Sequence, residues 1–138
     1  PHPRRHPAGH SYGQPEPRPK PLAPRDWRYL DDYLYGIDLY NFAYWWECHE
    51  AFEALWHAVG PQTEQGRFFQ ALIQLAAAGV KLAQGNLPAM RNLLRYGVAR
   101  LQRLPPFYMG LDVDDLMRDL LANIDHPLPH TSYLILQI

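Results

Sequence analysis

The segment "GRFFQALIQLAAAGVKLAQG", residues 66–85, limits the folds open to this chain more than any other part of it. It contains no proline, and its apolar side chains recur at helical spacing on almost every side. A helix that is apolar nearly all round is stable only when other elements cover it. This segment therefore predicts a central helix inside a helical bundle.

Turn signals divide the rest of the domain into four further helices. The expected helices cover residues 28–41, 44–58, 63–84, 87–104 and 112–124. Asn86 and Asp112 are expected to cap the fourth and fifth helices, and Gly85 to end the third. Apart from the tail "SYLILQI", no segment shows a strand pattern. The predicted fold is all-α, a single compact bundle of about five antiparallel helices with an N-terminal Pro-rich arm.

The arm is predicted from composition. The first 24 residues hold eight prolines and almost no aliphatic side chain, so they cannot build a core and should be extended. We divide the chain into an arm (1–26), a helical domain (27–125) and a C-terminal tail (126–138). His2, His6 and His10 recur every four residues in the arm, but without a helix to hold that spacing it does not favour a metal site.

Charge and cysteine content exclude several classes of protein. Thirteen basic and fourteen acidic residues nearly cancel, which does not point to nucleic acid or an acidic membrane. No apolar run reaches membrane-spanning length, and Cys48, the only cysteine, excludes an internal disulfide and fits a reducing compartment. We expect a cytoplasmic protein with no nucleic-acid and no membrane partner. A small-molecule ligand and a homo-oligomer are both compatible with the sequence.

The charges are distributed unevenly along the chain. Five of the thirteen Lys and Arg residues lie in the first 25 positions. Between Tyr29 and Gly66 there are seven acidic residues and no Lys or Arg. The acidic half of the domain contains "WWECHEAFEALWH", residues 45–57, in which histidines, glutamates and tryptophans are concentrated. Any chemistry of this protein is expected there.

Helical spacing separates this segment into two arcs. At about 100° per residue, one arc is polar and the other apolar. The polar arc holds Trp46, His49, Glu50, Glu53 and His57, and the apolar arc Cys48, Phe52, Leu55 and Val59. On the third helix, Gln70, Gln74 and Lys81 form a polar stripe whose burial without partners would cost a few kcal/mol. We expect Glu50 or Glu53 to hydrogen-bond to this stripe, with Arg91 and Arg95 as further partners, and the tryptophans at 45, 46 and 56 to belong to the core.

Two segments carry a resemblance to a known family. "YNFAYWWECHEAFEALWH" and "FFQALIQLAAAGVKLAQGN" resemble the family called domain of unknown function 309, which is also described as a predicted metal-dependent hydrolase. The resemblance covers residues 29 to 104 approximately. The matching positions are Trp46, Glu47, His49, Glu50, Glu53 and Trp56 in the first motif, and Gln70, Leu72, Ile73, Gln74, Leu75, Gly85 and Asn86 in the second. The resemblance implies an all-helical bundle and a hydrolytic activity.

The chain also departs from the family pattern. Ala43 and Ala71 stand where many relatives have Gly, and Cys48 stands in place of Ala. These changes affect packing and leave the polar residues in place. Lys81 occupies a position where some relatives carry His, which weakens any scheme with a metal ligand there.

The segment "HEAFE" offers part of a metal site. In the H-E-x-x-H motif of zinc proteases two histidines four residues apart hold the ion, but here the second position is Glu53. Glu53 could share an ion with His49 or with His57, but not with both, because those histidines lie roughly 12 Å apart along a helix. A third ligand would have to be Asp31, Asp32, Asp38 or a histidine of the tails. Carboxylate-rich ligation would suit Mg²⁺ or Mn²⁺ better than zinc.

Two functions follow as hypotheses. One is a metal-dependent hydrolase with His49, Glu50 and Glu53 as catalytic residues, and with His49 and Glu53 as metal ligands. Its binding residues would be Trp46, Glu47, Trp56, Gln70, Gln74 and Lys81. The other is a non-catalytic interaction or ligand-binding module in which the same cluster is a structural polar core. No cofactor is required by the sequence, although a divalent metal is compatible with it.

Overall fold

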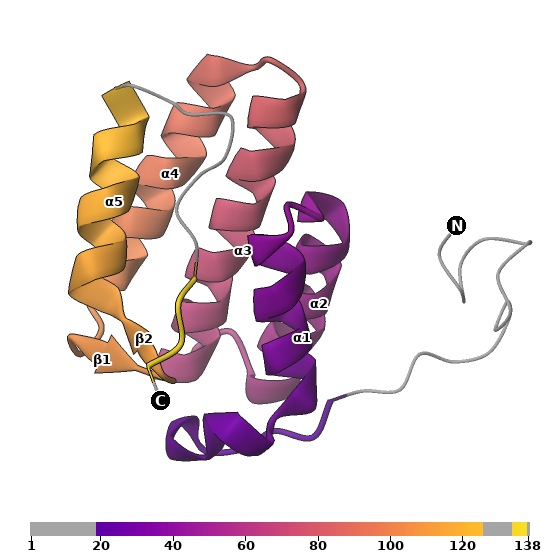
Figure 1. Cartoon of the computed structure of the whole chain (residues 1–138). Coiled ribbons are helices and arrows are strands. Elements are labelled where there is room, and N and C mark those ends of the chain that lie inside the picture. Colours follow the sequence, from indigo (N-terminus) through magenta and orange to yellow (C-terminus); the bar gives the residue numbers. More distant parts are fainter. Residues whose placement is uncertain (1–18, 126–133, 138) are drawn as a thin grey trace, which may run out of the picture.

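The computed structural model describes residues 19–125 and 134–137, and this part of the chain is mostly helical (Figure 1). Its α-helices are α1 (Asp31–Asn41), α2 (Trp45–Val59), α3 (Glu64–Ala83), α4 (Leu87–Leu101) and α5 (Val113–Asp125). A 3-10 helix, η1 (Pro24–Tyr29), precedes α1. The predicted all-α bundle of about five helices is confirmed. The predicted arm up to residue 18 and the tail histidines lie outside the described residues.

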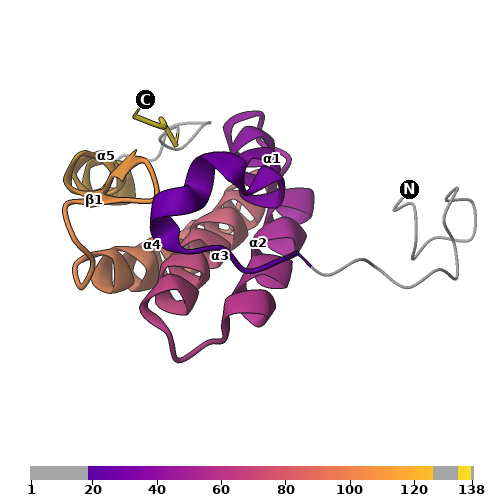
Figure 2. The same ribbon diagram turned by 90° about the horizontal axis from the view of Figure 1, so that it is seen from below.

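The helices run alternately up and down, and each packs mainly on its neighbours in the sequence. Seen from below, α3 lies between α2 and α4, while α1 covers α2 and α5 covers α4 (Figure 2). The apolar third helix is therefore at the centre, as predicted. Among the described residues, no helix is long and apolar enough to cross a membrane.

Side-chain caps start three of the helices. The Thr63 hydroxyl accepts from the Gly66 amide at 2.9 Å, Asn86 Oδ1 accepts from Ala89 at 3.2 Å, and Asp112 Oδ1 accepts from Asp115 at 3.0 Å. These bonds satisfy amides that the first turn of a helix leaves unpaired. The predicted caps at Asn86 and Asp112 are confirmed. The fourth helix ends at Leu101, three residues before the predicted Leu104.

The first predicted helix, 28–41, is divided in two. The chain leaves helical geometry at Leu30, with ψ 86°, and η1 and α1 lie on either side of it. The break allows both Trp27 and Leu30 to be buried, with the Trp27 ring lying directly on Gly110. Helical periodicity cannot predict such a break, because its cause is a contact with a residue far along the chain.

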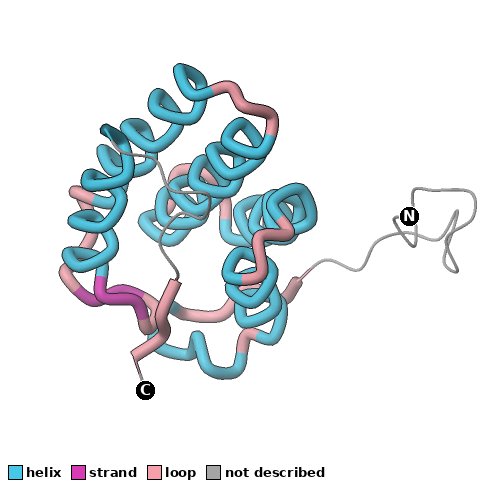
Figure 3. Tube along the Cα trace, turned by 45° about the horizontal axis from the view of Figure 1, so that its top comes forward, coloured by secondary structure: helices cyan, strands magenta, loops and turns pink. Residues whose placement is uncertain are grey.

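A small antiparallel hairpin, which the sequence did not predict, joins α4 to α5 (Figure 3). Its strands are β1 (Phe107–Tyr108) and β2 (Leu111–Asp112), and each is too short to show alternation. The buried Tyr33 hydroxyl donates to the Met109 carbonyl at 2.9 Å, which ties the turn of the hairpin to α1. Leu136, in the expected strand of the tail, forms an isolated bridge with Leu111.

Candidate functional site

The two arcs predicted for α2 are present in the structure. Cys48, Phe52 and Leu55 are fully buried on the side that faces the bundle. On the other side, Glu53 and His57 retain 46 % and 64 % of their side-chain exposure. Glu53 and His57 therefore face outward, whereas His49, on the same arc, is three-quarters buried.

A carboxylate lies between two imidazoles on this outer side. Glu53 Oε2 is 3.6 Å from His49 Nδ1, and Glu53 Oε1 is 3.7 Å from His57 Nε2. The three side chains belong to consecutive turns of α2, so the helix itself sets their spacing. The His49 ring stacks parallel to Trp46, with 5.7 Å between the ring centroids. We call His49, Glu53 and His57 the His–Glu–His row.

We predicted a hydrogen bond from Glu50 or Glu53 to the polar stripe of α3. For Glu53 this is wrong, and for Glu50 it stays a prediction. Glu53 contacts the two histidines of its own helix, while Gln74 Oε1 accepts a hydrogen bond of 3.0 Å from Arg100 Nε on α4. The physical reason is that the apolar arc of α2 packs on α3, which turns the polar arc away from it.

The arginines of α4 do not extend the site either. Arg91 Nε donates to the carbonyl of Ile124 at 2.9 Å, close to the C-terminal end of α5, where a cation is favourable. Arg95 is exposed on the outside of α4. The expectation that Arg91 would be a partner of the α2 glutamates is therefore wrong.

The tryptophans of α2 differ from one another in burial. Trp45 is buried, with its ring against Gly79 and in an edge contact with Tyr40 at 5.0 Å. Trp56 is partly buried, but Trp46 is 61 % exposed. The prediction that Trp46 belongs to the core is wrong, because position 46 lies on the polar arc.

Cys48 is a packing residue. Its side chain is fully buried, and burial, followed by the charge of Glu47, raises the pKa of the thiol well above its usual range. The thiol therefore stays protonated at neutral pH, whereas nucleophilic attack needs the thiolate. This agrees with the sequence-based view that Cys48 belongs to the apolar arc.

The described residues do not provide a complete metal site. Within residues 19–125 and 134–137, no group of three or more His, Cys, Asp or Glu side chains is placed to hold a metal ion. The row offers an ion two donors, Glu53 and one histidine, and the expected third ligands at positions 31, 32 and 38 do not join them. A catalytic zinc site takes about three protein ligands and a water. The donor set in this part of the chain does not fit such a centre.

An exposed stripe on α1 was missed in the sequence. Asp31, Tyr35, Asp38 and Phe42 follow one another at steps of four, three and four, which places them on one side of the helix. Tyr35 is 60 % exposed and Phe42 is 75 % exposed. The same helical spacing that identified the arcs of α2 would have found this set. We call these four residues the acid–aromatic stripe.

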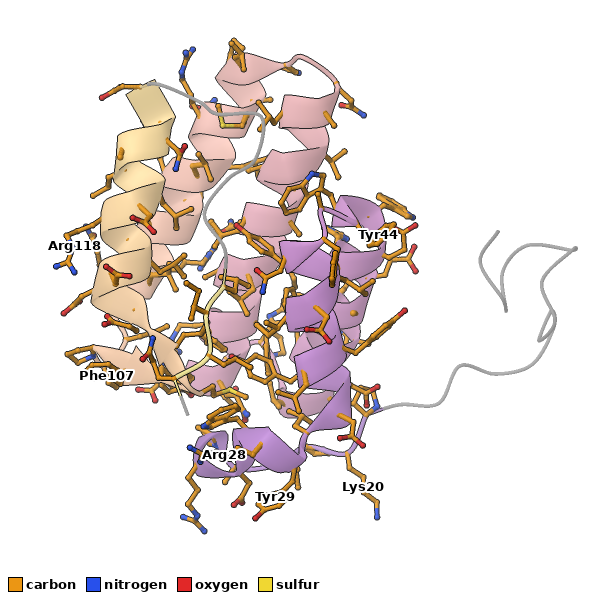
Figure 4. The ribbon with its side chains drawn as sticks, viewed as in Figure 1. Lys20, Arg28, Tyr29, Tyr44, Phe107 and Arg118 are labelled. Atoms are coloured by element: carbon orange, nitrogen blue, oxygen red, sulfur yellow. The ribbon has the colours of Figure 1, made fainter. Side chains whose placement is uncertain are left out.

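Two more aromatic side chains continue the stripe at the turn between α1 and α2. Tyr44 is 57 % exposed and lies at the end of α1 that is farthest from Lys20 (Figure 4). Trp46, two residues later in the sequence, is also exposed. Ala43 in this turn has φ +61°, a left-handed conformation that favours glycine.

Among the described residues, Asp31 and Asp38 form no ion pair. The α1–α2 surface, formed by the stripe together with Tyr44 and Trp46, thus combines exposed rings with carboxylates that no Lys or Arg of the described residues neutralises.

Comparison with known families gives one result. Residues 33–93 match the family described as domain of unknown function, DUF309. The chain carries a DUF309 domain. Comparison with curated proteins gives no match. The DUF309 domain begins at Tyr33 within α1 and ends at Leu93 within α4, so it contains most of the α1–α2 surface and the whole row, and excludes the hairpin and α5.

Proposed function

We propose that this protein is a non-catalytic interaction module that binds a segment of another polypeptide on its α1–α2 surface. The observation that carries the proposal is the acid–aromatic stripe. Single exposed apolar side chains are ordinary, but a group of them rimmed by polar residues is typical of an interaction site. Here Tyr35 and Phe42 alternate with Asp31 and Asp38 along one side of α1, and Tyr44 and Trp46 extend the group.

The chemistry of the stripe defines the partner. Carboxylates attract Arg and Lys, and a guanidinium group also stacks on aromatic rings. Proline-rich segments dock on rows of aromatic side chains in an extended conformation. The stripe therefore suits a basic, proline-rich segment. No Lys or Arg between Tyr29 and Gly66 competes for these carboxylates from the same part of the chain.

A binding experiment tests this proposal. A fluorescein-labelled peptide of alternating Pro and Arg is titrated with the full chain, and its anisotropy is followed. The double variant Tyr35→Ala/Phe42→Ala is expected to raise the Kd at least tenfold, or about 1.4 kcal/mol, because it removes the rings on which the peptide docks. Tyr96→Ala, which removes a ring of similar exposure on α4, is the matched control.

The salt and charge dependence completes the test. Binding should weaken as salt is added, since exposed charges are screened at physiological ionic strength. A peptide of alternating Pro and Glu should not bind. Equal affinity of the wild type and the double variant would refute a role for the stripe.

A second candidate function is metal-dependent hydrolysis of a small molecule. It is favoured by the position of Glu53 between His49 and His57, at 3.6 and 3.7 Å. Glu53 and one histidine would hold a divalent ion, with a further ligand from outside the described residues. The catalytic roles of His49, Glu50 and Glu53, and the binding roles of Trp46, Glu47, Trp56, Gln70, Gln74 and Lys81, stay predictions.

Elemental analysis separates the two functions. We expect the purified chain to contain far less than one equivalent of zinc, manganese or iron, because two donors hold an ion weakly. A chelator should leave the thermal midpoint unchanged, since nothing that stabilises the fold is removed. One equivalent of metal that is lost in His49→Ala would instead favour the hydrolase.

A further inference from the structure

We infer that the acid–aromatic stripe has an occupant within the same chain, residues 1–18, which bind to it intramolecularly. This inference rests on the proposed function and names the segment that occupies the site. It also gives the site a form of regulation, since a bound segment of the chain itself would compete with any partner of similar chemistry.

Residues 1–18 are long enough to cover the stripe. The stripe extends from Asp31 to Phe42, the residue that follows α1, and eleven steps of about 1.5 Å make this roughly 17 Å. An extended proline-rich segment advances about 3.1 Å per residue, so about six residues cover that distance. Eighteen residues are sufficient even if several of them only bridge the gap to the start of α1.

The segment is attached to the domain close to one end of the stripe. Gln65, a buried amide at the start of α3, donates to the Leu22 carbonyl at 3.0 Å and fixes the chain there. Lys20 lies at the end of the molecule where α1 begins, and Tyr44 lies at the opposite end of that helix (Figure 4). Residues 1–18 thus start next to one end of the stripe and need only follow α1.

The segment and the stripe are complementary in charge and composition. Residues 1–18 contain Arg4, Arg5 and Arg18 against a single acid, Glu16. Residues 29–66, which include α1, α2 and the start of α3, carry seven acids and no Lys or Arg. Five of the eighteen residues are proline, and the fixed φ of each proline lowers the conformational entropy that is lost on docking.

A short tether strengthens such a contact. Two groups joined by a short flexible linker meet at an effective concentration in the millimolar range. Weak stacking of prolines and arginines on Tyr35 and Phe42 is then enough to occupy the stripe for most of the time. An external segment of equal chemistry must displace it.

The experiment uses the full chain and the labelled Pro–Arg peptide. The variant Arg4→Glu/Arg5→Glu/Arg18→Glu is expected to bind this peptide at least tenfold more tightly than the wild type, because its own segment no longer competes. The charge-matched control is Arg95→Glu/Arg103→Glu/Arg118→Glu, in which all three exposed arginines lie on or next to α4 and α5. The control should bind the peptide far less tightly than the first variant.

Trypsin gives a second readout that does not depend on the peptide. Cleavage after Arg4 and Arg5 should be at least tenfold faster in Tyr35→Ala/Phe42→Ala than in the wild type, and unchanged in Tyr96→Ala. Equal cleavage in all three proteins would overturn the inference.

The outcomes distinguish this inference from the proposed function. If the wild type and the arginine variant bind the peptide equally and the stripe variant does not bind it, the intramolecular contact is refuted and the interaction module stands. If none of them binds the peptide, both ideas fail. A dimer in sedimentation that is lost in the arginine variant would show that the segment occupies the stripe of a second copy, which also overturns the intramolecular form.

Discussion

Phe52→Ala is expected to lower the free energy of unfolding by about 3 to 5 kcal/mol. Phe52 is fully buried on α2, and its ring lies directly against Gly36 of α1. A methyl group at Gly36 would come within 2.7 Å of the ring, so the two helices already approach as closely as the ring allows. Removing the ring leaves a cavity that the backbone of α1 can close only in part.

Urea denaturation followed by far-UV circular dichroism measures this effect. The midpoint should fall while the m-value stays constant, because the change acts on stability and not on the surface exposed by unfolding. Phe42→Ala removes a ring of the same size from the surface of the same helical pair and should change stability by about 0.5 kcal/mol or less. A loss below about 1 kcal/mol for Phe52→Ala would contradict the packing described for α1 and α2.

The same substitution bears on function. The side of α1 opposite the buried residues carries the acid–aromatic stripe, and the Phe52 ring sets how α1 lies on α2. Phe52→Leu retains most of the volume and should cost less than about 1.5 kcal/mol. We expect this variant to retain peptide binding. That result would show that binding depends on the position of the stripe and not on the overall stability of the domain.

The helices could be predicted from the sequence because their signals are local. The caps at Asn86 and Asp112 and the continuous apolar character of α3 depend on residues within a turn or two. The two arcs of α2 follow from the same periodicity, and Cys48, Phe52 and Leu55 are buried as expected. Sequence signals within a turn or two were therefore sufficient to predict this part of the fold.

The contacts of the polar residues could not be predicted in the same way. Periodicity shows which residues share a side of a helix, but not which neighbour that side meets. Gln74 is one of three partners predicted for the α2 glutamates, whereas in the structure its Oε1 accepts a hydrogen bond from Arg100 of α4. The break at Leu30 and the hairpin after α4 also depend on distant contacts, those of Trp27 with Gly110 and of Tyr33 with Met109.

Ala43 shows what a departure from a family pattern can mean. The residue has φ +61°, a conformation that costs a side chain roughly 1 to 2 kcal/mol and glycine almost nothing. Glycine, which many relatives are expected to carry there, would relieve this cost. The departure was interpreted from the sequence as a packing change, but the structure shows that it concerns the backbone of the turn that presents Tyr44 and Trp46.

Gly79→Val is expected to destabilise the protein by about 3 kcal/mol or more, because it inserts three carbon atoms into a contact that has no room for one. Gly79 is buried in the C-terminal part of α3, and a methyl group on it would overlap the indole ring of Trp45. That ring is held from another side by Tyr40, so it cannot simply swing away. Either α3 and the start of α2 must separate, or Trp45 must leave its rotamer.

A double-mutant cycle identifies the cause of this loss. With Trp45 replaced by alanine there is space for the new side chain, so Gly79→Val should cost at least 1 kcal/mol less in that background. Ala83→Val, at the exposed end of the same helix, controls for the lower helix propensity of valine and should cost only a few tenths of a kcal/mol. An equal cost of Gly79→Val with and without the Trp45 ring would show that the close approach of α2 and α3 does not depend on this glycine. Because Tyr44 and Trp46 flank Trp45, displacement of the ring should also weaken binding of the Pro–Arg peptide, which the same protein samples can report.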